Sequence, residues 1–106
     1  MRNLTPVELK AHLESAQQPP LLLDVREPWE FEYCRIEGSE LIPMGQIPAA
    51  AETLDKDRET VVICHHGIRS RQVAYFLDHI GFSNVINLAG GVEAWAQDVE
   101  PTMRRY

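Results

Sequence analysis

Val61-Val62-Ile63-Cys64-His65-His66-Gly67-Ile68-Arg69-Ser70 is the stretch that decides the fold. Its first three residues are apolar and β-branched, so they predict a buried parallel strand with Cys64 at its carboxyl end. The apolar residues after Ser70 recur with helical spacing: Val73, Phe76, Leu77 and Ile80. Open α/β sheets bind their ligands at the carboxyl ends of the strands. Cys64 is therefore a candidate reactive residue.

The loop between this strand and this helix favours a reactive cysteine over a structural one. A loop that enters a helix at its amino end directs backbone N–H groups and the positive end of the helix dipole toward the sulfur. We therefore expect an exposed Cys64 thiolate, with Arg69 as a nearby positive charge. The alternative is that Cys64 is a small core residue closing the strand. The expected substrate-binding loop consists of His65, His66, Gly67, Ile68 and Arg69.

Length and composition predict one globular domain spanning residues 1–106. Hydrophobic residues make up 44% and charged residues 25% of the chain, which is typical of soluble globular proteins and not of disordered or membrane proteins. The longest apolar run, Leu21 to Leu23, is too short to cross a bilayer, and no basic segment followed by an apolar one opens the sequence. We expect no membrane partner and a cytoplasmic location.

Charge and cysteine spacing argue against two further classes of function. The net charge is −6, and no basic cluster exceeds the Arg104-Arg105 pair, so nucleic acid is not an expected partner. Cys34 and Cys64 lie 30 positions apart without CxxC spacing, which argues against a disulfide scaffold. Consecutive Cys64, His65 and His66 side chains rarely converge on one tetrahedral ion, so we expect no metal site.

The rest of the chain alternates predicted helices and strands. Thr5, Pro6 and Glu8 form a capping box that starts a helix ending near Ala16. Strands are predicted over 21–25, 40–43 and 83–88, and helices over 28–33, 47–54 and 92–99. This order predicts a mainly parallel α/β sheet with helices on both faces and right-handed crossovers. Asp24 and Cys64 then emerge at one edge, where the Gly90-Gly91 turn is a candidate to join them.

Three blocks of sequence together resemble the single-domain rhodaneses, a family of sulfurtransferases. They are Leu23-Asp24-Val25-Arg26-Glu27-Pro28-Trp29-Glu30-Phe31, the loop from Cys64 to Ser70, and Asn87-Leu88-Ala89-Gly90-Gly91-Val92-Glu93-Ala94-Trp95. The resemblance implies a five-stranded parallel sheet flanked by helices, and a Cys64 persulfide that carries sulfur without a cofactor. It also implies a small sulfur-containing anion such as thiosulfate as donor, and cyanide, a thiol or a protein as acceptor.

The same resemblance leaves several roles open. Asp24 and Arg26 could take part in catalysis, but a charged pair at a strand end more often supports neighbouring loops, and we favour that supporting role for both, with Ser70. Cys34-Arg35 stands where the family usually has Gly-His. Cys34 is then a buried substitute for glycine or, less favoured, a resolving thiol. His65 and His66 match neither donor-specific loop pattern of the family. We predict from their imidazoles that donor binding strengthens as the pH falls toward 6.

Two other functions remain as alternatives. Cysteine-dependent phosphatases and arsenate reductases also place an anion-binding loop before a helix, but they have five residues between Cys and Arg, whereas four separate Cys64 from Arg69. The second alternative is a persulfide carrier or docking module that does not turn over free donor. The tail from Pro101 to Tyr106 either docks on the domain or frays, and the sequence does not decide between them.

Overall fold

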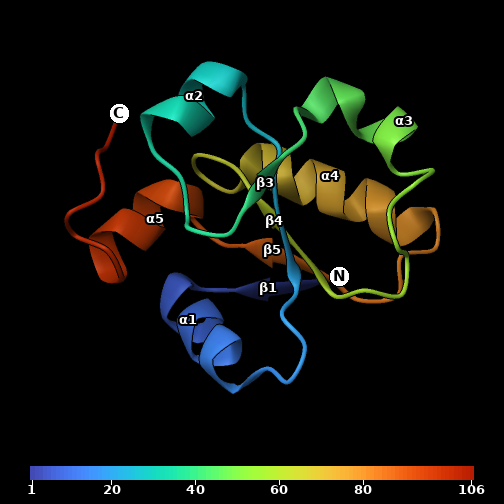
Figure 1. Ribbon diagram of the computed structural model, residues 1–106, viewed down its shortest axis with the longest axis horizontal. Helices are drawn as coiled ribbons and strands as arrows, with labels where there is room; N and C mark the ends of the chain where they lie inside the picture. Colours follow the sequence, from blue (N-terminus) through green and yellow to red (C-terminus); the bar gives the residue numbers. More distant parts are fainter.

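The computed structural model describes residues 1–106 and contains one five-stranded sheet with helices on both sides (Figure 1). All paired strands run parallel, in the spatial order β1-β5-β4-β2-β3. The strands are β1 (Arg2–Leu4), β2 (Leu21–Asp24), β3 (Glu40–Leu41), β4 (Thr60–Ile63) and β5 (Val85–Leu88). The predicted fold class is therefore confirmed.

The helices follow the predicted order. They are α1 (Pro6–Ser15), α2 (Pro28–Tyr33), α3 (Ile47–Ala50), α4 (Ile68–His79) and α5 (Gly91–Asp98), with a 3₁₀ turn over Met44–Gln46. The predicted capping box starts α1, because Thr5 Oγ accepts the N–H of Glu8 and the Glu8 carboxylate accepts the N–H of Thr5. No helix combines the length and apolar composition that crossing a bilayer requires.

The core consists of two apolar clusters, one on each face of the sheet. Strand β4 contributes to both, because its side chains alternate between the faces. Val61 and Ile63 pack with residues of α1 and α5, whereas Val62 and Cys64 pack with residues of α3 and α4. A strand buried on both faces needs a continuous apolar run, which explains the sequence of β4.

Several predicted boundaries were wrong for identifiable reasons. Strand β1 was missed, because its three residues carry two polar side chains and no alternating pattern. The helix predicted over 47–54 ends at Ala50, where the backbone changes to turns: the N–H of Glu52 bonds to Ala49 and that of Thr53 to Ala50. Strands β2, β3 and β5 begin or end one or two residues inside their predicted ranges, whereas β4 begins at Thr60, one residue before its predicted start.

The register of the sheet places three loops at one edge. Asp24 pairs with Ile63, and Val62 pairs with Asn87. The segments after β2, β4 and β5 therefore leave the sheet together, as predicted for Asp24, Cys64 and the Gly90-Gly91 turn. The N–H of Val92, just beyond that turn, donates to the Cys64 carbonyl at 2.9 Å.

Candidate active site

Cys64 lies directly after β4, and its sulfur faces the amino end of α4. The backbone N–H of Gly67, the residue before α4, donates to Cys64 Sγ at 3.0 Å. Gly67 has φ of +92°, a conformation that favours glycine. The positive end of the α4 dipole and this N–H therefore both act on the sulfur, as the sequence predicted.

A chain of buried polar side chains continues from the sulfur into the sheet. Cys64 Sγ lies 3.3 Å from Ser70 Oγ, which donates to Asn87 Oδ1 at 2.5 Å. Asn87 Nδ2 donates in turn to Asn3 Oδ1 at 2.9 Å. Ser70 is fully buried and Asn87 is 2% exposed, so each needs these partners. Ser70 thus contacts the sulfur itself.

Helix α5 fixes the orientation of the loop peptides. The carbonyl of Cys64 accepts the N–H of Val92, and that of His65 accepts the N–H of Glu93 at 3.1 Å. A Cβ on Gly91 would overlap both carbonyl oxygens, and Gly91 has φ of +60°. With these carbonyls turned to α5, the Gly67 N–H is left facing the sulfur.

Cys64 is more buried than the sequence prediction required. The residue is 1% exposed, and it belongs to the apolar cluster beneath α4. None of the three cavities of the molecule is lined by Cys64. The expectation of an exposed thiolate was therefore wrong, because the prediction considered the loop alone and not the segments that pack over it.

Arg69 is paired and does not present a free positive charge. Its two terminal nitrogens donate to the two carboxylate oxygens of Glu30 in α2, at 2.8 and 2.9 Å. The bond to Glu30 raises the pKa of Arg69. Burial would raise the pKa of Glu30, but the bonds from Arg69 and Tyr106 outweigh it and hold that pKa at about 2. Sequence analysis did not identify Glu30 as the partner of Arg69.

Asp24 and Arg26 form a fully buried ion pair beside the loop. The Arg26 guanidinium donates three hydrogen bonds to the Asp24 carboxylate, at 2.8 to 3.1 Å, and one to the carbonyl of Cys34 at 2.6 Å. The backbone N–H of Arg26 donates a further bond to Asp24 Oδ1 at 3.0 Å. Burial alone would lower the pKa of Arg26, but its bonds to Asp24 raise it. The pair therefore connects β2 to the segment that follows α2.

Cys34 is separated from Cys64 by the sheet. It lies in the apolar cluster on the α1 and α5 face, whereas Cys64 lies in the cluster on the opposite face. Arg26 Nη1 approaches Cys34 Sγ at 3.7 Å, and both cysteines are free thiols. This placement favours the small buried residue over the resolving thiol.

The two loop histidines stack on each other at the surface. Their ring centroids are 3.9 Å apart, and the other face of His65 stacks on Tyr106 at 3.8 Å. His65 Nε2 lies 3.6 Å from Glu93 Oε2. Burial, and then the neighbouring His66, lower the pKa of His65. Ile68 is 62% exposed at the start of α4.

Sequence analysis missed four residues of the site, and they differ in how clearly the sequence marks them as candidates. Asn87 is a polar residue within a buried strand, and such a residue needs an explanation. Glu30 lies in a block that the resemblance quoted, without an assigned role. Glu93 lies in another such block. Tyr106 carries no local signal, since only the fold brings it to His65.

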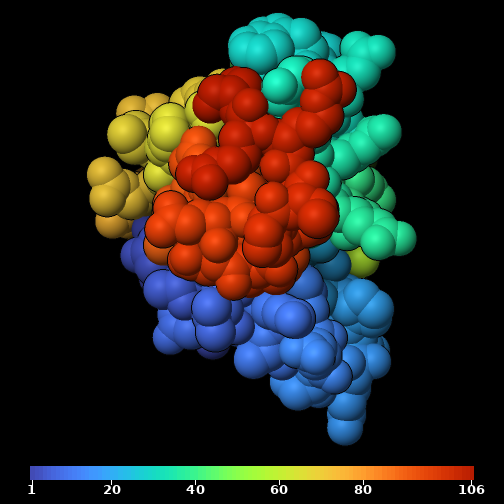
Figure 2. All heavy atoms as spheres, turned by 90° about the vertical axis from the view of Figure 1, so that its left-hand side faces the viewer, coloured from blue at the N-terminus to red at the C-terminus, as the bar shows by residue number.

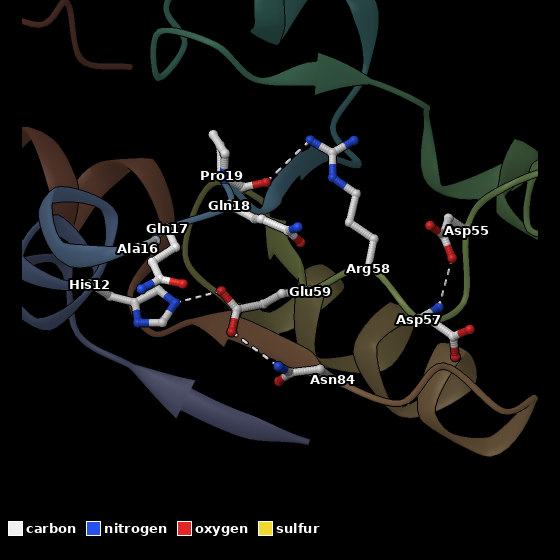
Figure 3. Close-up of a pocket in the computed structure, with 10 residues that line it drawn as sticks. All are labelled: His12, Ala16, Gln17, Gln18, Pro19, Asp55, Asp57, Arg58, Glu59 and Asn84. Atoms are coloured by element: carbon white, nitrogen blue, oxygen red, sulfur yellow. Dashed lines mark hydrogen bonds and ion pairs between the residues drawn. The ribbon is translucent and has the colours of Figure 1, made fainter.

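The largest cavity lies at the opposite end of the sheet from Cys64. Its volume is about 820 Å³, and residues before β4 and after α1 line it (Figure 3). Its polar side chains bind one another: Glu59 contacts both His12 and Asn84. Cavity size alone would therefore select the edge of the sheet opposite to Cys64. No group of three or more His, Cys, Asp or Glu side chains in the molecule is arranged to hold a metal ion.

Comparisons with known proteins agree with the fold and show the family of the chain. A family model for the rhodanese-like domain matches residues 5–98. The putative sulfurtransferase YtwF of Bacillus subtilis is 41% identical over 95% of this chain and 96% of its own length. The thiosulfate sulfurtransferase GlpE of Actinobacillus succinogenes is 36% identical over 81% of this chain and 78% of its own length.

One solved structure and one longer relative complete the comparison. The crystal structure of a rhodanese-like domain protein from Staphylococcus aureus superposes with a TM-score of 0.83, at 29% identity, over 100% of this chain and 99% of the other. The probable adenylyltransferase/sulfurtransferase MoeZ of Mycobacterium tuberculosis is 36% identical over 97% of this chain. The chain spans only 26% of the length of that relative.

Proposed function

The chain belongs to the rhodanese-like domain family, and from that membership we propose that it is a sulfurtransferase that carries sulfur as a Cys64 persulfide. The observation that carries this proposal is the Gly67 N–H that donates to Cys64 Sγ at the amino end of α4. An N–H in this position donates to the Cys64 sulfur and is placed to donate to a persulfide formed there. The relatives with sulfurtransferase names support the same chemistry.

The reaction divides one sulfur transfer into two displacements. In the first, the Cys64 thiolate attacks the outer sulfur of a donor such as thiosulfate. The bond between the two donor sulfurs breaks, and sulfite leaves with the electron pair. In the second, an acceptor such as cyanide or a thiolate attacks the outer sulfur of the persulfide. The Cys64 S–S bond breaks, and its electron pair returns to Cys64.

The surrounding residues hold this sulfur in place. Gly67 and Ser70 contact it, and Asn87 fixes the Ser70 hydroxyl. Arg69 positions the loop through Glu30, and the Asp24–Arg26 pair supports the neighbouring segment. The proposal places the protein in the cytoplasm, because the reaction needs Cys64 as a free thiol and thiols stay reduced there.

Phosphatase and arsenate reductase chemistry is less compatible with this geometry. Both need an arginine with free N–H groups to hold a tetrahedral oxyanion. Here Glu30 binds one N–H of each terminal nitrogen of Arg69 and balances the charge of the guanidinium, which weakens its attraction for a second anion. The shorter loop, with four residues between Cys64 and Arg69, also offers fewer amides.

A persulfide carrier remains the second candidate, because Cys64 is only 1% exposed. A buried sulfur exchanges slowly with free small molecules and suits delivery to a docked acceptor. The two functions share the persulfide and differ in turnover. A carrier would acquire sulfur but would not sustain multiple cycles with excess thiosulfate and cyanide.

The deciding experiment detects the persulfide. The protein is incubated with thiosulfate, and its intact mass is measured before and after cyanide is added. We expect an increase of one sulfur atom that cyanide removes, and no increase for Cys64→Ala. The matched control is Cys34→Ala, which removes the other cysteine and should leave the increase unchanged. An increase that persists in Cys64→Ala would contradict the proposal.

A further inference from the structure

The segment from Pro101 to Tyr106, here called the tail, returns over the loop that holds Cys64. Figure 1 places the end of the chain beside α2 and α5. In Figure 2 the last residues lie between α2 and the segment around residue 65. Met103 is 8% exposed and packs in the apolar cluster with Trp95. The tail is therefore anchored in the core three residues before Tyr106.

Tyr106 contacts the loop through its ring and the segment of Arg26 and Glu30 through its hydroxyl. The ring stacks on His65 at 3.8 Å with an interplanar angle of 17°. The ring also makes edge-to-face contacts with Trp29 and Tyr33, whose ring centroids lie 5.4 and 5.7 Å from its own. The hydroxyl accepts a hydrogen bond from Arg26 Nη1 at 2.9 Å and donates one to Glu30 Oε2 at 2.6 Å.

The end of the tail is held by side-chain contacts and by one bond to its main chain, from the Tyr33 hydroxyl to the Arg105 carbonyl at 3.3 Å. The last hydrogen bond between main-chain groups joins the N–H of Met103 to the carbonyl of Glu100. Beyond it, Arg105 pairs with Glu93, and Arg104 lies over the Tyr33 ring at 4.1 Å. Residues 104–106 can therefore leave without breaking the sheet or a helix.

The loop, by contrast, is held by main-chain bonds to α5 and by the close fit of Gly91. The end of the tail differs from α5 in having no bond between main-chain groups to the rest of the molecule beyond Met103, so it can open locally. Because Cys64 is 1% exposed, some segment must move before any reagent reaches the sulfur.

We propose that Tyr106 determines access to Cys64: its ring covers the mouth of the loop, and sulfur donors and acceptors react only when the tail is displaced. This inference rests on the proposed function. In the covered state the Cys64 persulfide is shielded from stray nucleophiles. The reaction rate with any reagent is then scaled by the fraction of molecules in which the tail is open.

The test measures the rate at which iodoacetamide alkylates Cys64, followed by peptide mass. We expect Tyr106→Ala to be alkylated at least about tenfold faster than wild type, because an aromatic pair and two hydrogen bonds are lost together. Tyr106→Phe keeps the stacking on His65 but loses the hydroxyl, so its alkylation rate should lie between those of wild type and Tyr106→Ala. The control is Tyr75→Ala, a change of an exposed tyrosine on α4 that should leave the rate unchanged.

A second measurement separates access from a loss of stability. Thermal unfolding and amide hydrogen exchange of the central strand β4 are followed in the same samples, because general loosening would change both. Cys34 is not used as the reporter, since Arg26 Nη1 contacts both Cys34 Sγ and the Tyr106 hydroxyl. If Tyr106→Ala unfolds, Arg105→Ala loosens the tail from its exposed side without touching Arg26 or Glu30. It should raise the Cys64 rate by a smaller factor. Wild-type rates in every folded tail variant would overturn the proposal.

Two unrelated reagents distinguish this inference from the proposed function. If Tyr106 controls access alone, Tyr106→Ala accelerates alkylation and sulfur uptake from thiosulfate by the same factor. Unequal factors would mean that Tyr106 contacts the donor and would overturn the access role. If no variant gains sulfur while alkylation is accelerated, the proposed function fails and the access role stands.

Discussion

Gly91 shows how much of the site depends on a single missing side chain. A Cβ there would overlap the carbonyl oxygens of Cys64 and His65, the two groups that orient the loop. The φ of +60° adds strain for any other residue. The loop and α5 can approach each other this closely only at a glycine.

We predict that Gly91→Ala abolishes sulfur uptake and lowers the free energy of unfolding by about 3 kcal/mol or more, as overlap and backbone strain combine. Gly38→Ala is the matched control, because Gly38 has φ of +85° and no atom lies within 4 Å of the position that a Cβ would take. Gly38→Ala should lower the free energy of unfolding only by the backbone strain, about 1 kcal/mol, and should leave sulfur uptake unchanged. Equal costs, measured by urea unfolding, would contradict this account.

His65 gives a prediction for the effect of pH on stability. Burial and His66 hold its pKa below the usual 6.5, so the unfolded chain takes up this proton first as the pH falls. The native state therefore loses stability as the pH falls below about 6.5. His65→Asn should remove this loss, which urea unfolding at pH 8 and pH 5 measures. The exposed His79→Asn is the control, and equal slopes in all three proteins would refute the prediction.

The same shift modifies the prediction made from the sequence for donor binding. An ordinary imidazole would gain charge as the pH falls toward 6. His65 contributes to that gain only at a lower pH, because its face lies against Tyr106 and its ring is partly buried. Sequence alone identifies the residue type and not its surroundings.

At the scale of elements, α2 and α4 are joined across the site by Glu30 and Arg69. Both carboxylate oxygens and both terminal nitrogens are used, which fixes the relative position of the two helices. Glu30 also accepts the Tyr106 hydroxyl, so one carboxylate connects two helices and the tail.

We predict that Glu30→Gln lowers the free energy of unfolding by about 2 kcal/mol at pH 7. The difference between the folded pKa of about 2 and the ordinary pKa of 4.5 corresponds to about 3 kcal/mol. Solvent screening at the half-exposed Arg69 side chain reduces this contribution. Because the folded pKa is depressed, this stability is present above pH 4.5 and is lost as the pH falls toward 2. Urea unfolding at pH 7 and pH 3 should show the difference from wild type shrinking. Glu32→Gln, exposed on the same helix, should show no difference at either pH.

The sequence predicted the elements that have strong local patterns. The capping box of α1, the apolar run of β4 and the spacing of α4 each identify their element without tertiary contacts. Strand β1 and the end of α3 were not predictable, because pairing with β5 and the turns after Ala50 decide them. The cysteine loop was predictable for the same local reasons, whereas the burial of Cys64 depends on residues distant in sequence.

At the scale of the whole molecule, one sheet separates two clusters of 12 buried residues each. Strands β2, β4 and β5 contribute side chains to both clusters, so neither face can lose its packing without the other. The radius of gyration, 12.6 Å, is close to the roughly 13 Å expected for a folded domain of this length. Residues 1–106 should therefore unfold as one unit.

We predict a single cooperative transition in urea, because the shared strands couple the two faces. The 6% exposed Trp95 reports on the α5 face, and circular dichroism reports on all helices. Trp29→Phe removes the other tryptophan, which is 61% exposed and would add an unrelated signal. The fluorescence and dichroism curves of this variant should coincide. Separate midpoints would indicate that the faces unfold independently.

The two outermost strands have a consequence for how other proteins engage this molecule. Strand β1 has three residues and β3 has two, so neither border offers enough free main-chain groups to recruit a further strand from another polypeptide. Growth of the sheet by intermolecular ladder formation is thereby disfavoured, which protects against fibrillar association. A protein that docks on this molecule would instead meet its loops and helix surfaces.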